Sequence, residues 1–222
     1  MFGRIAPRYD LMNALMTGGR DQAWRRKAAR LAAPPAGSLV LDLATGTADL
    51  ALALLEETRV RGVVGLDFVE DMLRLARDKL AARGERRVRL VAGDALALPF
   101  PDRAFGCVAS AFLLRNLTDL EAGLTEMRRV TAPGGSVAAL EITQPTLPGW
   151  RDAFRLYFHH VVPAIGAAVS GNRDAYTYLP RSVDRFVTPQ ELARLMDKVG
   201  LADVRVTRVG LGTVTIHVGR AP

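Results

Sequence analysis

The 222-residue sequence predicts an α/β fold built on a doubly wound, mostly parallel seven-stranded sheet that ends in an antiparallel hairpin. Two observations lead to this fold class. Apolar runs alternate with helix-forming runs from residue 39 to residue 142, which is typical of a parallel sheet with a helix between successive strands. Residues 203–218 instead hold two β-rich runs around Gly210-Leu211-Gly212, which predicts a hairpin.

Composition limits the kind of protein. With 49% apolar and 24% charged residues, the chain is globular, and its length suits one domain over residues 1–222. Cys107 is the only cysteine and the three histidines are dispersed, so neither a disulfide framework nor a metal site is predicted. No apolar run could cross a bilayer and no signal-peptide pattern is present, so we expect a cytoplasmic protein, with peripheral contact at the inner face of the cell membrane left open.

The net charge of +7 is compatible with nucleic acid, an anionic membrane face or acidic ligands. The cations are mostly arginines scattered along the chain, and the two densest groups, residues 20–30 and 83–89, can both be solvated faces. No nucleic-acid partner is therefore predicted.

The region before the sheet predicts a short arm and one helix. Residues 1–20 mix aromatic residues, Met and Gly, and suit one or two helical turns. Asp21 can cap a helix whose apolar face holds Trp24, Ala28 and Leu31. Pro34-Pro35-Ala36-Gly37 ends that helix and leads into the first strand.

The first strand leads into a turn of small residues that is typical of a nucleoside site. Leu39-Val40-Leu41-Asp42-Leu43 is followed by Ala44-Thr45-Gly46-Thr47-Ala48, and a helix-forming run extends from Leu50 to Glu57. Backbone N–H groups at a helix N-terminus can approach a ligand in such a turn. The next apolar run, Val63–Leu66, ends in Asp67, and an acid there can accept hydrogen bonds from ribose hydroxyls.

Two nucleoside cofactors fit this layout. A dinucleotide site needs a Gly-x-Gly-x-x-Gly turn, whereas Gly46 is the only glycine here. Asp42 and Asp49 would also repel a pyrophosphate. S-adenosylmethionine is cationic and has no phosphate, so the turn favours it over NAD. An ordinary ligand-free turn is the remaining alternative.

The remaining elements continue the alternation. We predict further helices over Glu70–Arg83, from Thr118 or Asp119 to about Val130, and from Thr188-Pro189 to near Gly200. We predict further strands over Arg87–Val91, Phe105–Phe112 and Ser136–Ile142. The hairpin consists of Asp203–Val209 and Thr213–Val218. Asp94 follows the third strand, where a carboxylate is placed to accept from an adenine amino group.

Residues 145–185 break the alternation and predict a helical, lid-like insertion within the domain. Apolar residues recur there at helical spacing, namely Phe154, Tyr157 or Phe158, Val161, Ile165 and Val169. Pro163 should kink or divide this helix after Val162. The stripe is accompanied by Arg151, Arg155, Arg173 and Arg181, a mix that suits an anionic membrane face. A helix pair that only closes the core is the alternative.

Several motifs carry a resemblance to a known family. They are Phe2-Gly3-Arg4-Ile5-Ala6-Pro7-Arg8-Tyr9-Asp10-Leu11-Met12-Asn13, Trp24-Arg25-Arg26, the turn after the first strand, Gly93-Asp94-Ala95, Leu98-Pro99-Phe100, Arg115-Asn116-Leu117-Thr118-Asp119, Pro133-Gly134-Gly135 and Tyr176-Thr177-Tyr178-Leu179-Pro180. With them the sequence resembles the C-methyltransferase family of menaquinone and ubiquinone biosynthesis, within the class I S-adenosylmethionine-dependent methyltransferases of Rossmann-like fold. Ala48 stands where many members have Gly.

The resemblance implies an activity. S-adenosylmethionine would be the cofactor, and the methyl group would go to a ring carbon of a prenylated quinol, with demethylmenaquinol to menaquinol as the expected reaction. A benzoquinol of the ubiquinone pathway is the alternative substrate, and nucleic acid is a weaker one. A homodimer is left open.

The resemblance also implies site residues. Cofactor contacts would fall on Gly46, Thr47, Asp67, Asp94, Ala95 and Ser110. Arg115 and Asn116 follow the fourth strand, at the edge of the sheet where such folds bind ligands, and are the predicted catalytic pair. Tyr9 and Asp10 are predicted on the substrate side. His217, on the last strand, is a weaker candidate for a base.

The nucleic-acid alternative lacks its motifs. An amino-methylating enzyme of that kind needs an Asn/Asp-Pro-Pro-aromatic run after the fourth strand, where this chain has Leu114-Arg115-Asn116-Leu117. A cytosine C5 enzyme needs a cysteine in a loop, whereas Cys107 lies in a predicted strand.

Overall fold

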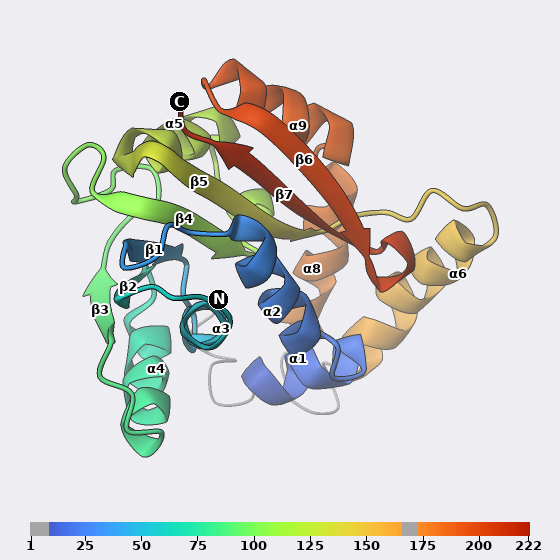
Figure 1. Cartoon of the computed structure of the whole chain (residues 1–222). Helices are drawn as coiled ribbons and strands as arrows, with labels where there is room; N and C mark the ends of the chain where they lie inside the picture. The colour runs from blue at the N-terminus through green and yellow to red at the C-terminus, as the bar shows by residue number, and fades with distance from the viewer. Residues whose placement is uncertain (1–8, 166–172) are drawn as a thin grey trace.

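The computed structural model describes residues 9–165 and 173–222, and these residues form one seven-stranded sheet with helices on both faces (Figure 1). The strands are β1 (Leu39–Leu43), β2 (Gly62–Asp67), β3 (Val88–Ala92), β4 (Phe105–Ala111), β5 (Thr131–Ile142), β6 (Ala202–Val209) and β7 (Val214–Arg220). The predicted fold class is confirmed, and every predicted strand is present.

The strand order explains where a ligand can enter. The order is β3-β2-β1-β4-β5-β7-β6, with β1 to β5 parallel and β7 antiparallel to both of its neighbours. The chain therefore runs outward from β1 to β3 and then returns to the other side of β1 as β4. Open parallel sheets bind ligands at this reversal, at the carboxyl ends of the strands.

Helices cover both faces. On one face lie α2 (Asp21–Ala32), α3 (Asp49–Glu57) and α4 (Glu70–Ala82), and on the other lie α5 (Leu120–Val130) and α9 (Pro189–Lys198). The α9 helix begins with a capping box between Thr188 and Glu191, with Pro189 at its start, as predicted. Asp119, rather than Thr118, caps α5 by accepting from the Ala122 N–H.

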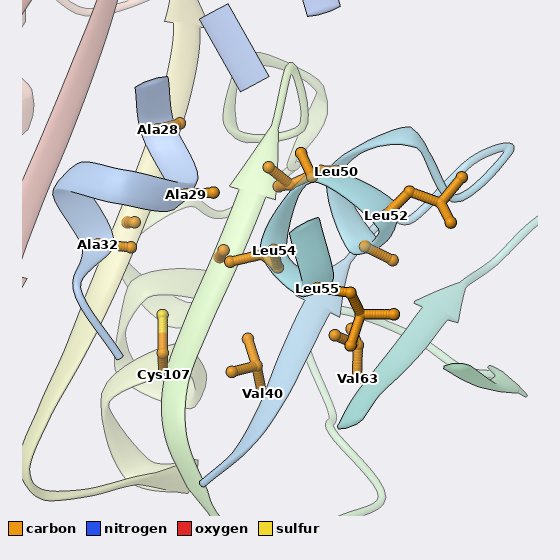
Figure 2. Packing of buried hydrophobic residues seen from close by; sticks show 14 of the residues in the cluster. Ala28, Ala29, Ala32, Val40, Leu50, Leu52, Leu54, Leu55, Val63 and Cys107 are labelled. Carbon is orange, nitrogen blue, oxygen red and sulfur yellow. The ribbon is translucent and has the colours of Figure 1, made fainter. Parts of the chain in front are cut away.

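Small side chains let α2 pack closely on the sheet. Ala28, Ala29 and Ala32 face Val40 and Cys107 across the core in Figure 2. Burial raises the pKa of the Cys107 thiol to about 11, so this cysteine is a small apolar core residue.

The prediction of which face of α2 is buried is partly wrong. Leu31 is 38% exposed, and the buried face is instead Arg25, Ala28, Ala29 and Ala32, at the i, i+3, i+4, i+7 spacing of a helix stripe. Asp21 does not cap the helix, because its carboxylate pairs with Arg25 one turn later. A buried arginine breaks the hydrophobic pattern on which the prediction rested.

Two helical regions lie outside these layers. The first is α1 (Tyr9–Thr17), and the second is the insertion, with α6 (Trp150–Leu156), η4 (Tyr157–Val161) and α8 (Arg173–Arg185). Pro163 does not divide the helix after Val162, because the helical run continues through Pro163 to Ile165. The irregularity lies one turn earlier, where η4 is a π-turn. This π-turn includes His159. In a regular α-helix the carbonyl of His159 would clash with the ring of Pro163, four residues later.

Two short connections complete the described fold, η3 (Leu114–Asn116) after β4 and η5 (Gly210–Gly212) in the terminal hairpin. Val169, predicted on the apolar stripe, lies outside the described residues, as does the side chain of Arg173. None of the described helices is both long enough and apolar enough to span a membrane.

Candidate active site

The turn after β1 has a backbone that few residues adopt. Ala44, Gly46 and Ala48 have φ values of 56°, 56° and 69°. A left-handed conformation costs a non-glycine residue roughly 1–2 kcal/mol, so the two alanines are strained. Strain of this kind concentrates at functional sites. The turn also ends at the N-terminus of α3, where N–H groups are unpaired within the helix.

Asp67, at the end of β2, holds this turn in place. Its Oδ2 accepts a hydrogen bond of 2.8 Å from the Gly46 N–H, and its Oδ1 accepts one of 2.9 Å from the Val69 N–H. Each carboxylate oxygen has a further lone pair, so the group can still accept from a ligand. Burial raises the pKa of Asp67, and these backbone donors oppose the rise.

A cavity of about 390 Å³ opens at the carboxyl ends of the central strands, beside this turn. Its lining residues are Ala44, Gly46, Leu66, Asp67, Phe68, Val69, Met72, Gly93, Asp94, Ala95, Leu96, Ala111, Phe112, Leu113, Asn116, Leu117 and Thr118. Asp67 and Asp94 are the only charged side chains among them. A cavity whose described lining is mostly apolar and carries two acids and no basic side chain suits a cationic nucleoside far better than a nucleoside that bears phosphates.

Asp94 lies at the exposed side of this cavity. Its Oδ1 accepts a hydrogen bond of 2.9 Å from the Leu96 N–H, which shapes the loop after β3. Ala95 beside it is buried. Together with the apolar lining, the two acids form a set of residues that fits S-adenosylmethionine.

Two buried polar groups lie behind the cavity wall. Asp42 is almost fully buried, and its Oδ2 accepts a hydrogen bond of 2.6 Å from the Thr45 hydroxyl. The Asp42 Oδ1 and the Ser110 Oγ have no hydrogen-bond partner among the described residues. Burial raises the pKa of Asp42 to about 7. Ser110 does not line the cavity.

Thr47 and Asp10 belong to a polar network beside the cavity. The Thr47 hydroxyl donates to Asp10 Oδ1 at 2.7 Å and accepts from Lys79 Nζ at 3.0 Å. Lys79 also pairs with Asp10 at 2.5 Å and with Asp49 at 2.8 Å. This lysine therefore ties α1 to the start of α3. The Tyr9 side chain lies outside the described residues.

Arg115 is held by a residue that the sequence analysis did not single out. Glu141, near the end of β5, is fully buried and accepts from Arg115 Nη1 at 2.9 Å and from the Leu114 N–H at 2.6 Å. Burial raises the pKa of Glu141, and the Arg115 guanidinium opposes that rise. The Arg115 side chain is only 8% exposed, and its Nε has no partner in the described part of the chain.

Asn116 links the cavity to the insertion. It lines the cavity, and its Nδ2 donates to the Phe112 carbonyl at 3.1 Å. Its Oδ1 accepts from the Tyr178 hydroxyl of α8 at 3.3 Å. The insertion therefore contacts the Arg115-Asn116 motif directly.

The predicted residues thus fall into two groups. Gly46, Asp67, Asp94, Ala95 and Asn116 line the cavity. Thr47, Ser110, Arg115 and Asp10 are absent from the described lining. His217 pairs in register with Ala139 in the middle of the sheet, and its Nε2 donates to the Pro189 carbonyl at 2.9 Å, so it is a packed core histidine.

Glu141 and Lys79 are two residues that sequence reasoning missed. Glu141 carried a usable signal, because a carboxylate near the end of an apolar strand run needs a partner when buried. Lys79 carried none, since one more lysine on an amphipathic helix is usually solvated.

Comparison with known proteins decides the family. The model of the ubiE/COQ5 methyltransferase family matches residues 1–221. The chain belongs to this family. Its members are methyltransferases that use S-adenosylmethionine, which is therefore the cofactor here. The resemblance found in the sequence motifs is confirmed.

Two relatives and one solved structure illustrate the similarity. The chain is 48% identical to a protein of Thermus thermophilus named demethylmenaquinone methyltransferase, over 100% of both chains. It is 45% identical to one of the same name from Roseiflexus castenholzii, over 99% of this chain and 91% of that protein. A methyltransferase structure from Thermotoga maritima superposes with a TM-score of 0.71 at 17% identity, covering 100% of this chain and 98% of the other, and it shows the shared fold.

Proposed function

We propose that this methyltransferase converts demethylmenaquinol to menaquinol. The observation that carries the proposal is its similarity, over the full chain, to proteins named demethylmenaquinone methyltransferase. A benzoquinol of the ubiquinone pathway is the alternative substrate that the resemblance of the sequence motifs implies.

The acceptor in this proposal is the reduced quinol. A quinone ring is electron-poor, whereas a deprotonated quinol hydroxyl makes the neighbouring ring carbon nucleophilic. S-adenosylmethionine supplies a methyl group as a cation equivalent and leaves as the neutral thioether. The ring carbon forms the new C–C bond as the C–S bond breaks, and it then loses its hydrogen as a proton while the quinol oxygen regains the proton that it gave up. The net release is one proton for each methyl group transferred.

The residues would divide this work between two sides of the site. We assign Gly46, Thr47, Asp67, Asp94, Ala95 and Ser110 to the cofactor. Asp67 would bind the ribose hydroxyls with its free lone pairs, and Asp94 would accept from the adenine amino group. Thr47 would act through the turn, because its hydroxyl is already engaged by Asp10 and Lys79.

On the substrate side we assign Arg115, Asn116, Asp10 and Tyr9. A guanidinium beside a quinol oxygen lowers the pKa of the hydroxyl and stabilises the resulting anion. The Nε–H of Arg115, which has no partner among the described residues, supports this role, because a buried donor without a partner is unfavourable until a ligand fills the position. Water exclusion strengthens this interaction.

The insertion would cover the prenyl tail of the substrate. It contacts Asn116 through Tyr178 and places Phe154 and Phe158 in a stacked pair, with ring centroids 5.0 Å apart. We also propose peripheral contact with an anionic membrane, where prenylated quinols reside. Homodimer formation remains a prediction.

Quinone profiling of cells tests the proposed reaction. In cells that lack the gene, mass spectrometry should find a menaquinone that lacks one methyl group. The wild-type gene should restore the methylated product, and Arg115→Ala should restore much less of it. An unchanged quinone profile in the deletion strain would contradict the proposal.

A further inference from the structure

One phenylalanine lies between two buried ion pairs at the end of β4. The Arg25 guanidinium carbon is 5.3 Å from the centroid of the Phe112 ring, and that of Arg115 is 5.6 Å from it. Arg25 pairs with Asp21 at 3.0 Å, and Arg115 pairs with Glu141 at 2.9 Å. All four charged side chains are nearly or fully buried.

This arrangement joins parts of the chain that are far apart in sequence. Asp21 and Arg25 come from α2, Phe112 directly follows β4, Arg115 lies in η3 and Glu141 lies near the end of β5. The electron-rich face of an aromatic ring attracts cations, and the attraction grows when water is excluded. The ring therefore holds each guanidinium from one side, while a carboxylate holds it from another.

The position of Phe112 connects this assembly to the candidate active site. Phe112 lines the cavity, and its φ of 63° is unusual for a bulky residue. Its carbonyl accepts from Asn116. An assembly that only braced the fold would have no reason to hold a strained aromatic residue at the cavity wall.

We propose that Arg25 and Glu141 are positioning residues that fix the Arg115 guanidinium, Glu141 by direct pairing and Arg25 through the Phe112 ring. The proposal rests on the role assigned to Arg115 above. With both restraints in place, the Arg115 Nε–H points in the same direction before and after the substrate binds. A group that is fixed in advance loses no reorganisation energy in the transition state.

Arg25→Lys is the informative variant for the more distant residue. Lysine retains the charge beside Asp21 but lacks the flat guanidinium that stacks on a ring. We expect kcat to fall at least tenfold, with the KM for the quinol and the affinity for S-adenosylmethionine changed less than threefold. Glu141→Gln should lower kcat with the same small change in KM. Phe112→Leu should also lower kcat, because it removes the ring between the two arginines. Arg26→Lys is the matched control, because Arg26 is exposed on the same helix.

The kinetic results distinguish the positioning role of Arg25 and Glu141 from the role of Arg115 itself. Thermal unfolding of each variant identifies those that fold as the wild type does, and only these are compared. Normal kcat for folded Arg25→Lys, together with a large loss for Arg115→Lys, would overturn the positioning role and leave the proposed function intact. Normal kcat for Arg115→Lys would overturn the assignment of Arg115 itself. If Arg25→Lys does not fold, Glu141→Gln and Phe112→Leu decide the proposal by the same comparison.

Discussion

At the scale of single residues, Asp67 combines two tasks that are usually separate. Its carboxylate accepts from the backbone of the turn after β1 and from the start of α4, and it also borders the cavity. The same group thus shapes the turn and presents acceptors to a ligand. Removing the Asp67 carboxylate should therefore affect both the shape of the turn and the binding of a ligand.

Asp67→Ala should weaken binding of S-adenosylmethionine by roughly 1.5–3 kcal/mol, the usual range for a hydrogen bond to a charged group. Isothermal calorimetry on the folded variant measures this loss. Asp71→Ala, which removes a nearby carboxylate from the first turn of α4, outside the cavity lining, is the matched control. Unchanged affinity in Asp67→Ala would show that the ribose assignment is wrong.

Asp42 makes the stability of the fold depend on pH. Burial raises its pKa from an ordinary 3.8 to about 7, so the folded protein holds the proton more tightly than the unfolded chain. The resulting stabilisation is fully present below pH 3.8 and is lost as the pH rises through 7. The difference between the two pKa values corresponds to a change on the order of 4 kcal/mol.

Asp42→Asn should remove this dependence, because an amide does not ionise. Relative to the wild type, the variant should become more stable as the pH rises from 5 to 8. Urea unfolding at both pH values, without cofactor, measures the difference, and other titrating groups such as Glu141 and His217 contribute to both proteins. A stability difference that stays constant with pH would mean that Asp42 is ionised in the fold throughout.

The sequence located some of these residues and not others for a physical reason. Asp67 ends β2, and Gly46 and Asp94 lie in turns just after β1 and β3. A parallel sheet brings the carboxyl ends of its strands to one edge. Glu141 and Arg25 act through partners that come from other elements, Arg115 in one case and Phe112 in the other. Sequence spacing contains no information about those contacts.

At the scale of elements, the sheet was predictable and the insertion only partly so. The central strands are apolar runs, β6 alternates apolar and polar residues, and the start of α9 carries a complete capping box. In α6 and η4 the apolar spacing was recognised, but the π-turn was not, because it depends on how the helix accommodates Pro163. Phe158 and Val162 are buried against Val183 of α8, which gives the insertion a small core of its own.

Phe154 tests whether this insertion grips a prenyl tail. Its side chain is partly buried and stacks on Phe158. Phe154→Ala should lower kcat/KM about tenfold on a long-tailed quinol and change it little on a tail-less one, because each buried CH₂ contributes roughly 0.8 kcal/mol.

Val183→Ala is the control, since it weakens the same small core without removing an aromatic ring. Its effect should be a lower melting temperature and equal activity losses on both substrates. If Phe154→Ala also loses activity equally on both, the insertion serves only to close the core.

At the scale of the whole molecule, exposed apolar side chains gather at one end. Leu11 and Leu15 lie on α1, Leu156 on α6 and Leu211 on η5, and all are 46% exposed or more. Contacts join these elements, because the Trp150 indole donates to the Leu211 carbonyl and the Tyr157 hydroxyl donates to the Met16 carbonyl. Figure 1 shows α6 and the β6–β7 turn on the side of the molecule opposite β3, with α1 below the sheet between the two sides.

This end should bind anionic lipid vesicles in preference to zwitterionic ones, with basic residues of α6 beside the apolar surface. Arg151→Glu with Arg155→Glu should reduce sedimentation with anionic vesicles, because each cation near such a surface contributes about 1 kcal/mol. Arg86→Glu with Arg89→Glu makes the same charge change at β3, on the opposite side, and should have little effect. Equal losses in both pairs would indicate attraction by net charge alone.

Methyl transfer by the purified protein is the most direct test of the central claim. The protein is incubated with S-adenosylmethionine that carries a labelled methyl group and with either the reduced or the oxidised form of demethylmenaquinone. The account predicts label in the lipid extract only with the reduced form, in a product in which one ring hydrogen has been replaced by a methyl group. Labelling of DNA but not of the quinol, or equal labelling of the oxidised quinone, would contradict it.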